Sequence, residues 1–195
     1  MLVFQRLLPL LAALLLGLGL GGCAGKVSPS SRYLLPAVAP EVADAPDATL
    51  ALGRLRLAHY LDVEGIVMQL DDIELREARE HRWAEGLDQQ LTRNLKAHLS
   101  RDLPTWRVTR ASPGDDDAYT LDVSIDQFQG RHDGYAVASG QWQLRSAQGR
   151  LLHMDSFSAN TALERDGYPA LVRALGKSLE QAADEMAAGI RRAVL

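Results

Sequence analysis

Cysteine is almost absent from this chain, because Cys23 is the only one among its 195 residues. No disulfide can therefore form within the chain. An excess of charge of one sign is also missing, since 21 Lys and Arg stand against 25 Asp and Glu, a net charge of −4. A nucleic-acid-binding protein would need a concentrated basic face, so this mild acidity argues against a nucleic-acid partner.

Sequence motifs of common catalytic and metal sites are missing as well. The chain has five histidines, and none forms an HExxH pattern: His59, His81, His98, His132 and His153. The chain has no Gly-x-Ser-x-Gly elbow and no phosphate-binding loop. We therefore expect no catalytic residues, no metal site and no cofactor, and we expect that the protein is not an enzyme.

The N-terminal residues have the layout of a secretory signal. Arg6 gives a short positive segment, and residues 7–20 are almost wholly Leu, Ala and Gly. This apolar run is shorter than the ~20 residues that a spanning helix needs. It ends at Gly22 and Cys23 in a sequence that resembles the bacterial lipobox. The pattern predicts signal cleavage between Gly22 and Cys23, with lipid attached to the Cys23 thiol.

An ordinary signal peptide or an uncleaved anchor, with a chance cysteine, is the alternative interpretation. Lipid attachment explains better why a lone thiol would be kept in an oxidising periplasm. Ala24 follows the cysteine, where an aspartate would indicate retention in the inner membrane. We therefore expect the mature protein on the periplasmic face of the outer membrane, held by its lipid.

Three segments follow from this layout. Residues 1–22 are expected to form the lipoprotein signal peptide. Residues 23–48 are small, polar and rich in Ala and Pro, which predicts a lipidated N-terminus and tether with a short strand near residues 32–36. Residues 49–195 are long enough to form a single globular domain with a core of its own.

Hydrophobic periodicity within the domain predicts strands and two helices. Leucines recur every fourth residue over 83–102, and apolar residues line one face over 168–193, which indicates two amphipathic helices. Alternating or β-branched runs predict strands at 50–57, 66–70, 73–78, 106–110, 119–128, 136–144 and 150–161. The second and third of these form a hairpin over 66–78. The pattern also predicts a break or bulge at Gly53 and a bulge at residues 126–127. The order predicts an α+β fold, with an antiparallel or mixed sheet and both helices packed on one face.

One connection is a candidate binding site. Arg131, His132 and Asp133 lie between two expected strands and are followed by Gly134. They could form a loop that docks on a partner. An ordinary hairpin turn, in which glycine supplies a positive φ, is the simpler alternative.

Several of these segments together resemble the ABC-type transport auxiliary lipoproteins, and within them the PqiC/YmbA-type lipoproteins of the outer membrane. The similar segments are residues 32–36, 58–61, 83–91, 121–123, 128–131, 133–134 and 139–142. They extend over most of the mature chain, and their combination is more specific than any one of them.

This resemblance implies an accessory role in a PqiABC-like system that moves lipid between membranes and maintains envelope integrity. It implies a PqiB-like periplasmic partner with MCE domains and assembly into a homo-oligomeric ring. Cys23 is the one residue to which it assigns a role. A membrane-tethered periplasmic hydrolase acting on envelope components remains the alternative function, and it would require a nucleophile beside a base.

Overall fold

The central strand of the fold is the segment with the clearest alternation of apolar and polar residues. The computed structural model describes residues 30–114 and 117–194, and in it this segment is strand β6, Tyr119–Arg131. β6 pairs in antiparallel fashion with β7 (Tyr135–Arg145), and β7 pairs in the same way with β8 (Leu151–Ala162). The predicted meander is therefore confirmed, and so is the bulge after Ile125, where the register with β7 shifts.

Two strands run parallel to β6 along its other edge. β2 (Ala48–Leu57) pairs with the first half of β6, and β3 (Gly65–Gln69) pairs with its end. A short 3-10 turn, η1 (His59–Leu61), lies between β2 and β3. β5 (Trp106–Arg110) extends the sheet beyond β2, while β4 (Leu75–Trp83) and β1 (Ser31–Tyr33) extend it beyond β3. The result is one mixed sheet of eight strands.

The bulge in β2 has a specific cause. The register between β2 and β6 shifts between Leu52 and Leu55. A Cβ atom on Gly53 would lie 2.4 Å from Oδ1 of Asp122 on β6, so only glycine leaves room for that carboxylate. Oδ1 of Asp122 accepts a hydrogen bond from the backbone N–H of Arg54 at 2.8 Å, which satisfies a donor that the bulge removes from the ladder.

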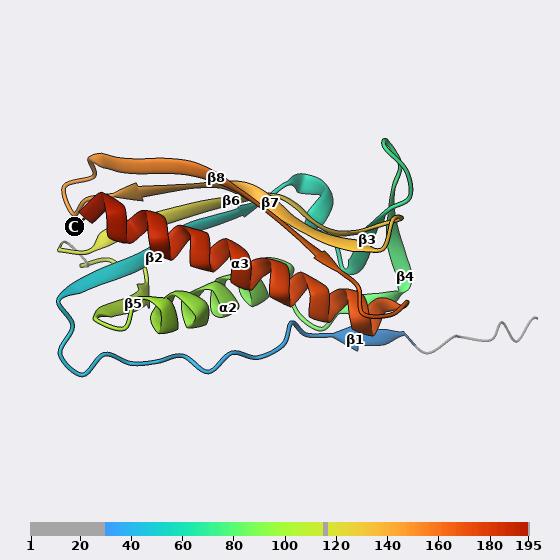
Figure 1. Ribbon diagram of the computed structural model, residues 1–195, viewed down its shortest axis with the longest axis horizontal. Coiled ribbons are helices and arrows are strands. Elements are labelled where there is room, and N and C mark those ends of the chain that lie inside the picture. The colour runs from blue at the N-terminus through green and yellow to red at the C-terminus, as the bar shows by residue number, and fades with distance from the viewer. Residues whose placement is uncertain (1–29, 115–116, 195) are drawn as a thin grey trace, which may run out of the picture.

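Both helices cover the same face of the sheet (Figure 1). α3 (Tyr168–Val194) packs on β7 and β8, and α2 (Leu87–Asp102) packs on β2, β5 and α3. The helices bury the apolar stripes that the sequence predicts, including Leu91 and Leu95 of α2 and Leu175 and Leu179 of α3. The α+β class is confirmed. Within residues 30–114 and 117–194, no helix combines the length and the apolar character needed to cross a bilayer.

One helix boundary differs from the sequence-based expectation. The helix expected over 83–102 begins at Leu87, and Trp83 belongs to β4 instead. Trp83 lies four residues before Leu87, so its burial fits the helical period equally well. The backbone decides the matter, because Trp83 pairs with Tyr33 of β1 and the N–H of Ala84 bonds to the carbonyl of Tyr33 at 2.9 Å.

The hairpin between β3 and β4 is confirmed, but its turn is longer than expected. β4 begins at Leu75, so Ile73 lies in the connection rather than in a strand. Its side chain is 88% exposed. Ile73 is therefore exposed like the polar residues on either side of it, and it does not contribute to the core.

Candidate functional site

The expected cleavage and lipid-attachment residues, Gly22 and Cys23, lie outside the described part of the chain. The structure shows instead where the chain enters the folded body. Ser31 pairs with His81 at the start of β1, so the entry point lies beside β4. Eight residues of chain lead from Cys23 to Ser31 and can span at most about 29 Å. A lipid on Cys23 would therefore keep this end of the sheet, named here the entry end, close to a membrane.

An aromatic cluster holds β1 against the body. The hydroxyl of Tyr33 lies 2.8 Å from Nδ1 of His81. The His81 ring stacks on Tyr168, at the start of α3, with ring centroids 3.9 Å apart. Burial raises the pKa of Tyr168, in keeping with a ring packed between elements. β1 is thus joined to both β4 and α3.

The residues that follow β1 are held by both helices. Leu35 is buried, and its N–H donates a hydrogen bond of 2.9 Å to Oε1 of Gln90 in α2. Pro36 packs against Gly176 of α3, where a Cβ atom would come within 2.9 Å of the proline ring. Any force on the N-terminal segment would therefore be transmitted to the sheet and to both helices.

The predicted docking residues form the turn between β6 and β7. Arg131 makes an ion pair with Asp133, and its guanidinium lies 5.9 Å from the centroid of the Tyr135 ring. Gly134 has a φ of 84°, as the hairpin-turn interpretation requires. Two of the three residues thus have partners within the turn, while His132 is exposed.

The connection between β3 and β4 lies beside this turn, and the sequence did not indicate it as a candidate binding site. Gln69, at the end of β3, pairs with Arg131, which brings residues 70–74 next to the β6–β7 turn. Oδ1 of Asp71 accepts hydrogen bonds from the N–H groups of Ile73 at 2.9 Å and Glu74 at 2.6 Å. These two bonds lower the pKa of Asp71, and nearby His132 adds to the effect. Asp71 is the sequence signal for such a turn, because an aspartate side chain can bond the backbone N–H two residues further on, here that of Ile73.

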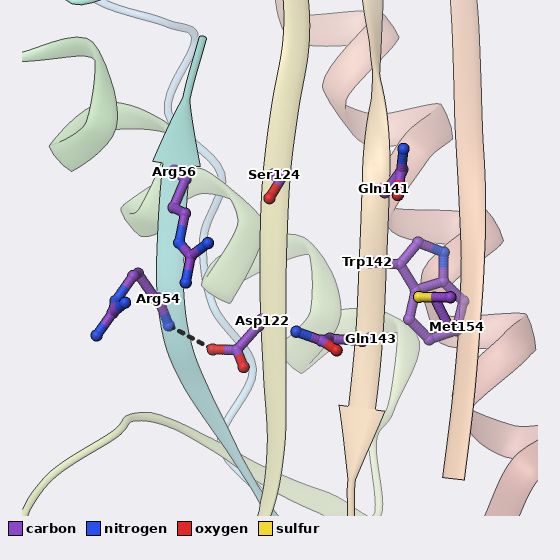
Figure 2. A pocket seen from close by; sticks show the side chains of 8 residues that line it. All are labelled: Arg54, Arg56, Asp122, Ser124, Gln141, Trp142, Gln143 and Met154. Carbon is purple, nitrogen blue, oxygen red and sulfur yellow. Dashed lines mark hydrogen bonds between the residues drawn. The ribbon is translucent and has the colours of Figure 1, made fainter. Parts of the chain in front are cut away.

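The face of the sheet opposite the helices carries a shallow hollow of about 110 Å³ (Figure 2). Its lining is polar apart from Trp142 and Met154, and it comprises Arg54, Arg56, Asp122, Ser124, Gln141, Trp142, Gln143 and Met154. The Asp122 carboxylate is already engaged by the β2 bulge. The hollow can therefore offer hydrogen bonds to a small polar group, mainly from guanidinium and amide donors.

The histidines with described contacts lie against aromatic rings or beside charged side chains. Nδ1 of His98 lies 3.3 Å from Nη2 of Arg101, and burial lowers the pKa of this imidazole. Nε2 of His153 lies 3.8 Å from Oδ2 of Asp155, and the ring packs against Trp142. The Arg101 guanidinium disfavours protonation of His98. A guanidinium is also not the nucleophile that a hydrolase would need beside its histidine.

Comparison with known proteins bears directly on these features. Residues 33–187 match the family described as the ABC-type transport auxiliary lipoprotein component. The chain is 33% identical over 178 residues to the intermembrane transport lipoprotein PqiC of Escherichia coli K12, covering 90% of this chain and 94% of PqiC. PqiC of Shigella flexneri matches to the same extent.

Two solved structures share the fold. The crystal structure of an uncharacterized protein that is 33% identical covers 84% of this chain and 99% of its own, with a TM-score of 0.74. A protein of Xanthomonas campestris, 18% identical, covers 83% of this chain and 94% of its own, with a TM-score of 0.66. The family match over residues 33–187 includes the aromatic cluster of Tyr33, His81 and Tyr168 and both exposed connections.

Proposed function

Because this chain belongs to the family of ABC-type transport auxiliary lipoprotein components, we propose that it is the lipid-anchored accessory component of an intermembrane lipid-transport system. In this role it contributes to the integrity of the envelope. The observation that carries the proposal is the match to an intermembrane transport lipoprotein along nearly the full length of both chains.

The anchor on Cys23 places the protein on the periplasmic face of the outer membrane. Signal cleavage after Gly22 frees the amino group of Cys23, and two or more acyl chains make attachment firm. The aromatic cluster of Tyr33, His81 and Tyr168 supports this role, because it fixes the folded body to the segment that leads to the lipid.

The partner of this accessory protein is a PqiB-like periplasmic protein with MCE domains. Copies of the lipoprotein assemble into a ring around or beside that partner. β8 supports such assembly, because among the strands of residues 30–114 and 117–194 it pairs with β7 alone, and it bears two exposed apolar side chains, Leu151 and Met154. An exposed strand edge of this kind is available for contact with another chain.

Replacement of the anchoring cysteine tests the proposal. Cys23→Ala is expected to leave the folded body intact and to release the protein from the outer membrane, because the thiol that carries lipid is gone. Circular dichroism measures the first effect, and fractionation of the envelope measures the second. Ser28→Ala, in the same segment, is the matched control and should fractionate like wild type.

Two results would contradict the proposal. Retention of Cys23→Ala in the outer membrane at the wild-type level would refute lipid anchoring through this residue. Failure of the wild-type protein to co-isolate with the MCE-domain protein after crosslinking would refute the accessory role.

A further inference from the structure

The connection between β3 and β4 presents an apolar side chain on an ordered backbone. Ile73 is 88% exposed, although Asp71 fixes the N–H groups of both Ile73 and Glu74. The connection is closed by a hydrogen bond of 2.9 Å from the N–H of Leu70 to the carbonyl of Glu74. The backbone at Ile73 is therefore fixed although the side chain is exposed, so the connection itself would lose little backbone entropy when a partner covers it.

The connection projects beyond the sheet at the same end of the molecule as β1, but on the opposite side of the view from β1 (Figure 1). It stands next to the β6–β7 turn, because Gln69 pairs with Arg131. Two further side chains near these connections, Leu75 and Tyr135, are each 41% exposed. The two connections thus present Ile73 together with other partly exposed apolar groups.

Acidic groups surround Ile73 and restrict the chemistry of what could cover it. Asp71, Asp72 and Glu74 flank it, and Arg76 of β4 makes an ion pair with Glu74 at 3.0 Å. Insertion of Ile73 into a bilayer would bring three carboxylates to the headgroups, which are commonly anionic. A protein pocket that is apolar at its base and lined with lysine or arginine at its rim complements this pattern.

We propose that residues 70–74 are the docking point for the periplasmic protein partner, with Ile73 seated in an apolar pocket that has a basic rim. This inference rests on the proposed function, since the partner is the protein that receives or delivers the transported material. It places the contact in the β3–β4 connection, with the β6–β7 turn alongside.

A pair of matched substitutions tests the inference on the full-length lipidated protein. Ile73→Ala removes most of the exposed side chain and should weaken binding of the purified MCE-domain partner by at least about tenfold. Val42→Ala is the control, because Val42 is 83% exposed and lies far from the connection in sequence. Both variants should melt at the wild-type temperature, since neither side chain packs in the core.

Charge provides an independent readout. Asp72→Asn leaves the hydrogen bonds of Asp71 intact and removes one carboxylate beside Ile73. It should weaken binding and make the dissociation constant less sensitive to added salt. Unchanged affinity and unchanged salt dependence in this variant would overturn the basic-rim assignment.

The outcomes separate this inference from the proposed function. If the wild-type protein does not bind the partner, the accessory role is refuted, and the docking point with it. If the wild-type protein binds the partner and both Ile73→Ala and Val42→Ala bind it equally well, the docking point alone is overturned. A photo-crosslinker introduced at position 73 should react with the partner, whereas adducts with lipid or with a second copy of this chain would overturn the inference.

Discussion

Gln90 offers a direct test of how the N-terminal segment is joined to the folded body. Its side chain is completely buried in α2. Oε1 accepts the N–H of Leu35 at 2.9 Å, and Nε2 donates to the carbonyl of Glu85 at 3.1 Å. Gln90→Leu keeps a similar volume and removes both hydrogen bonds.

The expected cost follows from the groups left behind. The buried N–H of Leu35 would lose its partner, which costs about 1–3 kcal/mol. The carbonyl of Glu85 lies at a more open site and adds less. The leucine side chain returns part of the loss through apolar burial, so we expect a net destabilisation of about 2 kcal/mol. For a domain of this size the melting temperature should fall by about 4–8 °C.

Thermal denaturation and limited trypsin digestion measure the two consequences. The variant should melt earlier, and Arg32 in β1 should become cleavable under conditions that spare the wild type. Gln89→Leu is the matched control, because Gln89 is the exposed neighbour on the same helix and should change stability by less than about 0.5 kcal/mol. Equal melting and equal protection of Arg32 in both variants would refute the reasoning.

Two further substitutions test the packing of the helices. Gly189→Ala should destabilise the protein by about 1–2 kcal/mol in chemical denaturation despite the better helix propensity of alanine, because its Cβ would lie 2.5 Å from the buried ring of Trp142; a gain in stability would contradict this. Burial lowers the pKa of His98 below its usual value of 6.5, so the unfolded state binds more protons and stability should fall as pH drops below about 6.5. His98→Gln should flatten this dependence in melts between pH 5 and pH 7, and an unchanged slope would count against it.

Much of the fold could be predicted from the spacing of apolar residues within single elements. The alternation in β6, the buried row on β7 and the apolar stripes of both helices each follow from the spacing of side chains along one element. A helix or strand that must bury one face shows this in its own residues. The α+β class and the meander were therefore predictable before any contact was known.

Pairing between distant segments was not predictable in the same way. Trp83 fits the stripe of α2 by spacing, but its backbone pairs with β1. The parallel placement of β2 and β3 along one edge of β6 depends on partners more than 50 residues away in the chain. A turn such as 70–74 carries only weak local signals, because its ends are determined by where two strands stop pairing.

The candidate site likewise has one part that the sequence predicts and another that only the tertiary structure shows. Residues 20–23 by themselves predict cleavage and lipid attachment, because a signal peptidase recognises a short sequence motif whatever the rest of the chain folds into. Only the tertiary structure places the β3–β4 connection, with Ile73, beside the β6–β7 turn and pairs β1 with the opposite end of β4. That arrangement arises from strand pairing over long sequence separations, in which each residue's environment is supplied by segments that its own neighbourhood does not specify.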